Sequence, residues 1–525
     1  MNGIDAFKWL RAKPRRLPFD RSVNQSGVSE SLLSNGFPYS RRLHSHESCV
    51  NALTFSSGDG RWMASGGDDK LVKLWDFHQD DVTRPTLNLS GPRANILTLA
   101  FSENNRYLYS GGVCETVYRY DISTLGVEAV SPTPQGAYID SDDSIRSISC
   151  HPFNEDLALT ASEDGCIYRY DARDVNTRRT RENTLELNAS ASGALYHPTM
   201  AHIFLTSDSR GRVCLRDERM AFGSGERTDG GIVQRYNTNL TKKTVNHLSN
   251  PEASSIVFDR TGSKFAITMV NFFPTIFSTS DPNPIAICSG KYLPNGDLVD
   301  TTSSRTYQNA CTMKHGSFGG PGMDEDIYYG AGSDDFRGYV WKLPPISELV
   351  EQRREINASD WHAAEPESTI AFTAGFSQPK YVPVDISQPF CHLNGHLSIV
   401  NTIVFHPQFL HVATAGVEKD IILHSPTPGS PCTRDLARSP LEVRKLSEDG
   451  TEDRLLYYTS LVSDIDRTEA RTISLFDHLI REESDNDIFL TRRWRPDTED
   501  EEDSDEEMAG DSSSGEESDQ DIDPY

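Results

Sequence analysis

Short runs of alternating apolar and polar residues recur along the chain, separated by turns rich in Gly, Asp and Ser. In the clearest unit, residues 46–55 alternate, a Gly58-Asp-Gly60 turn leads to residues 62–65, and a Gly66-Gly-Asp-Asp69 turn leads to residues 71–76. Alternation with a period of two, bounded by such turns, predicts three short antiparallel strands. The unit closes with the dipeptide Trp75-Asp76.

Weaker units with the same order of strands and turns follow along the chain. The seven closing positions are Trp75, Tyr120, Tyr170, Arg216, Phe277, Trp341 and His424. A repeat of about 40–45 residues with a His near its start and Trp-Asp at its end is the signature of a WD-repeat blade. The sequence therefore predicts an all-β fold, a single seven-bladed WD-repeat β-propeller with disordered N- and C-terminal tails and a few helical insertions.

We expect five regions along the chain. They are a basic, mostly disordered arm (1–36), the propeller (37–426, with insertions at 222–246 and 344–389), a polar linker (427–470), an amphipathic helix (471–483) and an acidic disordered tail (484–525). Segment 37–43 precedes the first repeat and is placed to supply the outer strand of the last blade. That pairing would remove the free sheet edge at the seam of the ring.

Two helices are expected outside the repeats. The first lies in the insertion 344–389 and has Ser347 as its N-cap. In the second, Ile473, Phe476, Leu479 and Ile480 form one apolar stripe. Such a stripe either packs on its own domain or docks on a partner, and both alternatives stay open. Within the arm, the basic motif 13–16 is either part of a disordered segment or a short nuclear-import or partner-binding signal.

The residues that define the first repeat suit a structural hydrogen-bond network. His46, Ser65, Asp69 and Trp75 can form one buried chain in which imidazole, hydroxyl, carboxylate and indole N–H satisfy one another. We assign His396, at the start of the seventh unit, to the same kind of network. Paired carboxylates such as Asp68/Asp69 and Asp334/Asp335 fall in tight turns, where they form turns and join such networks.

The net charge of −27 is unevenly distributed. Fifteen acidic residues lie between Asp497 and Asp523 and no Lys or Arg follows Arg495, so the rest of the chain is only mildly acidic. This argues against direct nucleic-acid binding, which needs a positive face. A signal-peptide core, a membrane-length apolar run and Cys-x-x-Cys pairs are all missing. We expect a protein of the nucleus, the cytoplasm or both, with reduced thiols and no membrane contact.

Motifs for catalysis are missing from the sequence. It contains no phosphate loop, Gly-x-Ser-x-Gly elbow, His-Glu-x-x-His or dinucleotide-binding glycine fingerprint. Residues His151, His197 and His406 each precede a Pro after an apolar run, as expected for the end of a blade's first strand. We therefore expect a binding scaffold and not an enzyme, with no catalytic residues, no cofactor and no metal.

Two closing strands are followed by the same motif. Asp171-Ala-Arg173 and Asp217-Glu-Arg219 lie one blade apart, which places two guanidinium groups on one rim of the ring. They are either solvated loop charges or a docking site. Arginine is frequent at interface hot spots because its planar fork makes several hydrogen bonds. No such motif follows Asp76 or Asp121.

With this pair the chain resembles the WD-repeat substrate receptors of cullin-4 RING ubiquitin ligases. The likeness spans roughly residues 37–483 and is carried further by segments 49–53, 65–69, 309–314, 332–336, 340–341, 395–401, 415–419 and 475–482. The Trp expected before each Asp is replaced by Tyr170 and Arg216.

The resemblance implies how such a protein works. Asp171, Arg173, Asp217 and Arg219 would dock on the ligase's propeller adaptor, damage-specific DNA-binding protein 1, and another surface would recruit an unknown target protein for ubiquitination by the cullin-4 ligase. The alternative is a non-ligase WD-repeat scaffold for a chromatin or RNA-processing assembly, whose basic partners the acidic tail would suit.

Overall fold

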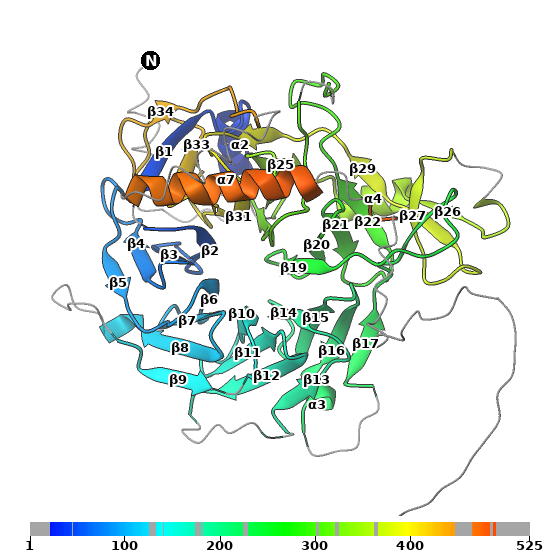
Figure 1. Cartoon of the computed structure of the whole chain (residues 1–525), viewed down its shortest axis with the longest axis horizontal. Coiled ribbons are helices and arrows are strands. Elements are labelled where there is room, and N and C mark those ends of the chain that lie inside the picture. The colour runs from blue at the N-terminus through cyan, green and yellow to red at the C-terminus, as the bar shows by residue number, and fades with distance from the viewer. Residues whose placement is uncertain are drawn as a thin grey trace, which may run out of the picture. The chain divides into compact units, whose positions relative to one another are not determined.

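The architecture is a ring of sheets (Figure 1). The computed structural model describes residues 21–44, 46–124, 133–139, 141–173, 180, 182–223, 229–300, 304–320, 325–361, 366–446, 465–483 and 487–489. Within these ranges, seven sheets stand side by side as blades, and an eighth, smaller sheet lies outside the ring. The predicted seven-bladed all-β propeller is therefore confirmed.

The first four blades have four strands each, numbered from the centre of the ring outward. Blade 1 consists of β2 (Val50–Phe55), β3 (Trp62–Gly67), β4 (Val72–Asp76) and β5 (Leu87–Leu89), and blade 2 of β6 (Ile96–Phe101), β7 (Tyr107–Gly112), β8 (Thr116–Asp121) and β9 (Gly136–Ile139). Blade 3 consists of β10 (Ile145–Cys150), β11 (Leu157–Ser162), β12 (Cys166–Asp171) and β13 (Thr184–Glu186), and blade 4 of β14 (Ala191–Tyr196), β15 (Ile203–Asp208), β16 (Val213–Asp217) and β17 (Ile232–Arg235).

The last three blades draw strands from distant parts of the chain. Blade 5 consists of β19 (Ala253–Phe258), β20 (Lys264–Met269), β21 (Thr275–Ser278), β22 (Pro284–Cys288) and β29 (Val384–Ile386). Blade 6 consists of β23 (Ser317–Gly319), β24 (Tyr328–Gly332), β25 (Gly338–Lys342) and β30 (Cys391–Leu393). Blade 7 consists of β31 (Val400–Phe405), β32 (Val412–Gly416), β33 (Asp420–Ser425), β1 (Tyr39–His44) and β34 (Ala437–Arg438). Each predicted closing position falls in the third strand of its blade.

The core lies between neighbouring blades, which pack face to face. Between blades 1 and 2, for example, Leu74, Ile96, Leu108 and Tyr120 belong to one cluster and are at most 1% exposed. Full burial of a large apolar side chain contributes about 1.5–3 kcal/mol. Each blade therefore depends on its two neighbours for stability.

Strand β1 closes the ring. Its residues pair antiparallel with β33, from Tyr39 opposite Ser425 to His44 opposite Asp420. Leu43 of this strand is fully buried. Because β1 precedes blade 1 in sequence but belongs to blade 7, it joins the two ends of the ring. The closure predicted for the segment before the first repeat is confirmed by this pairing.

The two predicted insertions contain structure that the sequence did not indicate. Segment 222–246 was expected to be a connection, but it holds β17, the outer strand of blade 4, and β18 (Leu240–Lys242). Strand β18 pairs with β27 (Ile370–Phe372) of the second insertion. With β26 (Arg354–Ile356) and β28 (Lys380–Val382) they form the eighth sheet. Strands of three residues are too short for a visible alternation, so no local pattern marks them.

Two helix predictions need correction. Helix α4 (Ile346–Gln352) has Pro345 at its N-cap without a side-chain capping hydrogen bond, so the predicted cap at Ser347 is wrong. Helix α2 (Arg21–Leu33) lies in the arm expected to be mostly disordered. Leu33 is 1% exposed and packs in one cluster with Phe37 and Cys391, and this burial holds the end of the helix on the ring.

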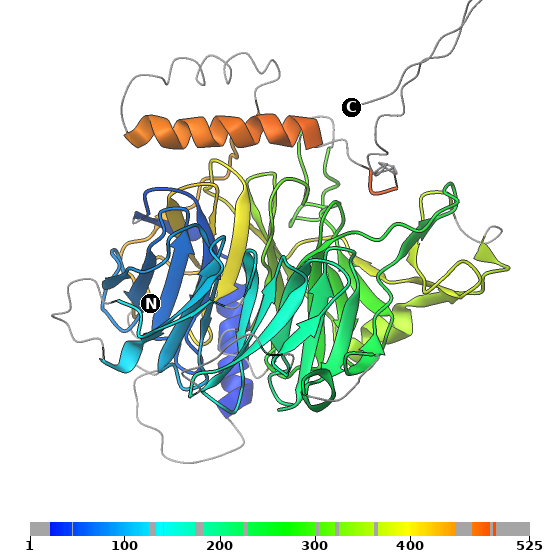
Figure 2. The ribbon, with the colours of Figure 1, turned by 60° about the horizontal axis from the view of Figure 1, so that its bottom comes forward.

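Helix α7 (Ile465–Glu483) begins before the predicted residue 471 and lies along one face of the ring (Figure 2). Ile480 is 1% exposed and packs with Phe336 and Val417, so the apolar stripe packs on its own domain. Arg444 adds a bidentate ion pair to the buried Asp477, at 2.8 and 2.6 Å.

Some predictions concern residues that the structure does not describe. The basic motif 13–16 and the acidic segment 497–523 lie outside the described ranges. Of the helices within those ranges, none has the length and apolar character needed to cross a bilayer.

Candidate interaction site on one rim of the ring

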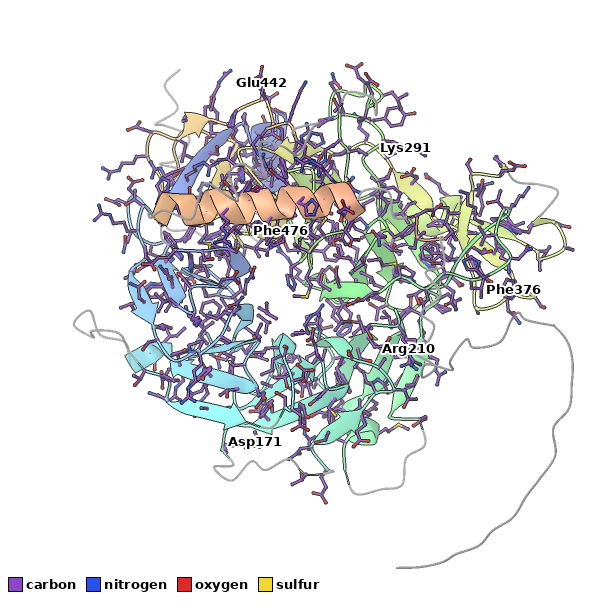
Figure 3. The ribbon with its side chains drawn as sticks, in the orientation of Figure 1. Asp171, Arg210, Lys291, Phe376, Glu442 and Phe476 are labelled. Atoms are coloured by element: carbon purple, nitrogen blue, oxygen red, sulfur yellow. The ribbon has the colours of Figure 1, made fainter. Side chains whose placement is uncertain are left out.

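The two Asp-x-Arg motifs lie on the same face of the ring. Strands within these blades are antiparallel, so the end of a third strand lies beside the turn between the first and second strands. Accordingly, Ala172 N–H donates to the Asp156 carbonyl in that turn of blade 3, and Glu218 N–H donates to the His202 carbonyl in that turn of blade 4. Figure 3 labels Asp171 on the outer part of blade 3. Helix α7 packs instead on turns between second and third strands, at the opposite face.

The two motifs have the same geometry. In blade 3, Arg173 donates from Nε and Nη2 to the two carboxylate oxygens of Asp171, at 2.9 and 2.6 Å. In blade 4, Arg219 donates from the same atoms to Asp217, at 3.1 and 2.7 Å. In both motifs the backbone N–H of the Arg also donates to the Asp, at 3.0 and 2.9 Å. Each Asp therefore accepts hydrogen bonds that fix both the backbone turn and the orientation of the guanidinium group.

Both arginine side chains remain accessible. Arg173 is 64% exposed and Arg219 is 66% exposed. The hydrogen bonds from each Arg lower the pKa of Asp171 and of Asp217 below the usual range of a carboxyl group. The pairs are therefore charged at neutral pH and lie on the surface, oriented but not buried.

A second contact fixes the two blades relative to each other. Glu218, the residue between Asp217 and Arg219, is 6% exposed and accepts hydrogen bonds from Arg169 of blade 3, at 3.2 Å, and from the Tyr196 hydroxyl, at 3.3 Å. The middle residue of the second motif therefore ties its strand end to the neighbouring blade. This tie limits the relative movement of the two arginines.

Blades 1 and 2 carry related Asp–Arg pairs on the same face, which were not predicted from the sequence. Arg61 donates to Asp76 at 3.3 and 3.0 Å, and Arg106 donates to Asp121 at 3.3 Å. In blades 1 and 2 the Arg is the residue immediately before the second strand, whereas in blades 3 and 4 it lies two residues after the Asp. An Arg at that position, opposite a closing Asp, is the signal that could have revealed them.

The residues predicted for the first repeat's network lie together. His46 Nδ1 is 2.8 Å from Asp69 Oδ2, and His46 Nε2 is 2.8 Å from Ser65 Oγ. Trp75 Nε1–H donates to the same Ser65 oxygen at 3.1 Å. Burial lowers the pKa of His46, so the imidazole is neutral and can accept from Ser65 while it donates to Asp69.

Blade 7 has a second network around His396. Its Nδ1 lies 2.7 Å from Glu418 and its Nε2 lies 2.8 Å from the Thr414 hydroxyl, which also contacts His424 Nε2 at 2.9 Å. His396 was predicted from the sequence to belong to such a network, whereas its partners Glu418, Thr414 and His424 were not.

The other paired carboxylates named in the sequence analysis also have hydrogen-bond or ion-pair partners in the structure. Asp68 accepts from Asn51, and Asp334 forms a fully buried ion pair with Lys314 at 2.6 Å. In the described part of the chain, no group of three or more His, Cys, Asp or Glu side chains is arranged to hold a metal ion.

Comparison with known proteins agrees with this architecture. The family described as "WD domain, G-beta repeat" matches residues 38–76 and 83–121. These ranges comprise the closing strand β1, blade 1 and the first three strands of blade 2. The chain is a WD-repeat β-propeller protein.

More particular similarity is to the cullin-associated WD-repeat proteins. Over 403 residues, or 76% of this chain, it is 27% identical to DDB1- and CUL4-associated factor 5 of Mus musculus and of Homo sapiens. That match covers 35% of each relative, so the chain spans about a third of the length of these curated relatives. It is also 25% identical over 227 residues to Protein ALTERED SEED GERMINATION 2 of Arabidopsis thaliana, which covers 38% of this chain and 29% of that protein. The resemblance to cullin-4-associated WD-repeat proteins that the sequence indicated is confirmed by the similarity to DDB1- and CUL4-associated factor 5.

Proposed function

We propose that this protein is a substrate receptor of a cullin-4 RING E3 ubiquitin ligase, acting in the nucleus, the cytoplasm or both. It docks on damage-specific DNA-binding protein 1 through Arg173 and Arg219 and recruits a target protein for ubiquitination. It binds and does not catalyse. The observation that carries the proposal is the pair of exposed arginines, each held by its own Asp, on neighbouring blades. The similarity to DDB1- and CUL4-associated factor 5 supports it.

The geometry suits docking on a protein surface. A bidentate carboxylate fixes each guanidinium before binding, so little side-chain freedom is lost when a partner arrives. Arginine is enriched at interface hot spots, where one side chain contributes 2 kcal/mol or more. Two such groups in a fixed relative position present a specific pattern and not a diffuse positive charge.

The double variant Arg173→Ala with Arg219→Ala tests the proposal. We expect the full-length variant to recover at least about tenfold less adaptor in co-purification, because loss of two hot-spot side chains costs several kcal/mol. Its unfolding free energy should change by less than about 0.5 kcal/mol for each exposed side chain. Adaptor binding is quantified by mass spectrometry and stability by thermal unfolding.

A matched control removes the same charge from the same face. Arg61→Ala with Arg106→Ala alters the pairs of blades 1 and 2, and this variant should retain the adaptor. Full retention of adaptor by folded Arg173→Ala/Arg219→Ala protein would contradict the proposal. Wild-type protein that recovers chromatin or RNA-processing proteins without adaptor would favour the non-ligase scaffold instead.

A further inference from the structure

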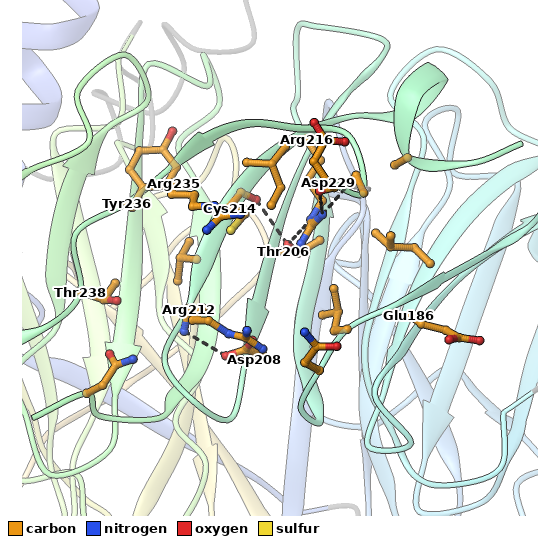
Figure 4. Close-up of a pocket in the computed structure, with 18 of the residues that line it drawn as sticks. Glu186, Thr206, Asp208, Arg212, Cys214, Arg216, Asp229, Arg235, Tyr236 and Thr238 are labelled. Carbon is orange, nitrogen blue, oxygen red and sulfur yellow. Dashed lines mark hydrogen bonds and ion pairs between the residues drawn. The ribbon is translucent and has the colours of Figure 1, made fainter. Parts of the chain in front are cut away.

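A pocket of about 1170 Å³ opens beside blade 4 (Figure 4). Its walls come from β16 and β17, from the outer strand β13 of blade 3, and from the connection 236–239. Neither Arg173 nor Arg219 lines it. The pocket therefore does not include the docking arginines, although Ala221, two residues after Arg219, is part of its lining.

A buried guanidinium group lies in the wall of this pocket. Arg216 is 7% exposed; its Nε donates to Thr206 Oγ1 at 2.9 Å and its Nη1 donates to the Gly230 carbonyl at 2.7 Å. It makes no ion pair with a carboxylate of the described residues. Burial lowers its pKa, and the nearby cations Arg235 and Arg212 act in the same direction. A buried charge without a counter-ion is costly to a folded protein.

The structural role of Arg216 does not explain this charge. In blade 1 the equivalent residue Trp75 donates one indole N–H to a hydroxyl of the second strand. Arg216 Nε reproduces that bond with Thr206. An uncharged indole would satisfy the same network, so the positive charge and the Nη2 group need another reason.

Other basic side chains share the face of blade 4 that lines the pocket. Side chains alternate along a strand, so Arg212 and Arg216 lie on the same side as Cys214. Arg235 of β17 pairs directly opposite Cys214 and therefore lies on that side too. Arg212 is neutralised by Asp208 at 2.7 Å, whereas Arg235 is exposed and has no carboxylate partner within the described ranges.

We propose that this pocket binds a phosphate group, with Arg216 in its wall and Arg235 at its opening. Two carboxylates, Glu186 and Asp229, also line the pocket, and Asp229 accepts the Gly231 N–H at 3.1 Å. Within the described ranges neither forms an ion pair with Arg216 or Arg235, so these two guanidinium groups remain for a ligand. A phosphate monoester carries nearly two negative charges at neutral pH and matches two guanidinium groups, whereas a carboxylate would match one. The pocket is much larger than the ion, so it has room for the chain that carries the phosphate. The favoured ligand is a phosphorylated peptide segment, and free phosphate shares the same chemistry.

Titration calorimetry of the full chain tests this. The probes are inorganic phosphate, a short phosphoserine peptide and the same peptide without phosphate. We expect the phosphopeptide to bind and the unphosphorylated peptide not to. Arg216→Trp, which keeps an N–H for Thr206, and Arg235→Gln should each weaken binding at least tenfold. Arg210→Gln is the control, because Arg210 is exposed on the same blade but does not line the pocket.

The outcomes separate the two sources of phosphate. Tighter binding of the phosphopeptide than of inorganic phosphate identifies a peptide ligand, and equal binding identifies the free ion. Absence of binding by wild-type protein at millimolar probe overturns the proposal. So does wild-type affinity in both Arg216→Trp and Arg235→Gln, with Arg235→Gln deciding if Arg216→Trp does not fold.

Discussion

At the scale of single residues, the donor that closes a blade can be exchanged without loss of the network. A second-strand hydroxyl contacts a nitrogen of the closing residue in three blades: Trp75 to Ser65 at 3.1 Å, Arg216 to Thr206 at 2.9 Å and His424 to Thr414 at 2.9 Å. Indole, guanidinium and imidazole each supply one N–H at the required position. In blades 4 and 7 the loss of Trp is therefore a change of donor, whereas Trp341 of blade 6 donates to the Ser289 carbonyl and not to a second-strand hydroxyl.

Removal of the central imidazole should destabilise blade 1. His46→Ala removes two buried hydrogen bonds, one to Ser65 and one to Asp69, whose side chain is 3% exposed. A buried hydrogen bond contributes about 0.5–1.5 kcal/mol, and one to a charged group about 1.5–3 kcal/mol. We expect the free energy of unfolding to fall by at least about 2 kcal/mol in denaturant titrations. His78→Ala is the control, because His78 is exposed and faces Asp59 on the surface at 3.5 Å. Equal effects of the two substitutions would contradict the role assigned to His46.

At the scale of elements, the sequence predicted those parts whose signal is local. Alternation and Gly/Asp turns marked the inner strands, and Ile480 belonged to a visible helical stripe. The Asp171 and Asp217 motifs were found because Asp and Arg are two residues apart. The pair of Arg61 with Asp76 was missed because its members are brought together only by strand pairing.

Elements formed by contacts between distant segments could not be predicted. The eighth sheet joins Leu240–Lys242 to Ile370–Phe372, and neither strand is long enough to show a period. Likewise, Glu418 takes the place that Asp69 has in blade 1, and only the fold shows that it reaches His396.

Strand β1 is the element on which closure of the ring depends. Deletion of residues 1–44 removes β1, which pairs with β33 along its full length. The deletion should therefore leave the edge of β33 unpaired and expose the residues that β1 covers. We expect a lower unfolding midpoint and self-association, measured by thermal unfolding and light scattering. Deletion of residues 1–20 leaves β1 and α2 in place and is the control. A monomeric 45–525 protein with an unchanged midpoint would show that β1 is dispensable.

At the scale of the whole molecule, histidines join neighbouring blades on the face that carries the Asp-Arg pairs. His197 Nε2 lies 3.0 Å from the Gly262 carbonyl in blade 5, while its Nδ1 accepts the Thr199 N–H at 3.2 Å. His151 reaches the Ala201 carbonyl of blade 4 in the same way, at 2.8 Å. A Cβ at Gly262, whose φ is +72°, would lie 2.1 Å from the His197 ring, so this turn requires glycine. Only a neutral imidazole can donate at one nitrogen and accept at the other.

Dependence on neutral histidines predicts that the ring loses stability in mild acid. His406 and His411 are fully buried, and burial lowers their pKa values to about 3 and about 4. The unfolded chain takes up their protons near pH 6.5, whereas the folded protein does not, so the free energy of unfolding falls as pH decreases from about 6.5 to 4. Each histidine contributes at most about 1.4 kcal/mol per pH unit. Asp335, Asp68 and Glu252, whose pKa values are raised by burial, act in the opposite sense. Carboxyl groups whose pKa values are lowered, such as Asp69 and Glu418, act in the same sense as the histidines.

Denaturant titrations at pH 7, 6 and 5 measure this slope. His406→Phe keeps a ring among Phe55, Phe77 and Phe409 but cannot titrate, so it should reduce the slope by up to about 1.4 kcal/mol per pH unit. The comparison uses the slope and not the absolute stability, because the substitution also removes an acceptor for two backbone N–H groups. A free energy of unfolding that stays constant or rises between pH 6.5 and 5 would contradict the neutral state assigned to His406 and His411 in the folded ring. The hydrogen bonds assigned to them would then be impossible, since a protonated imidazole has no acceptor nitrogen.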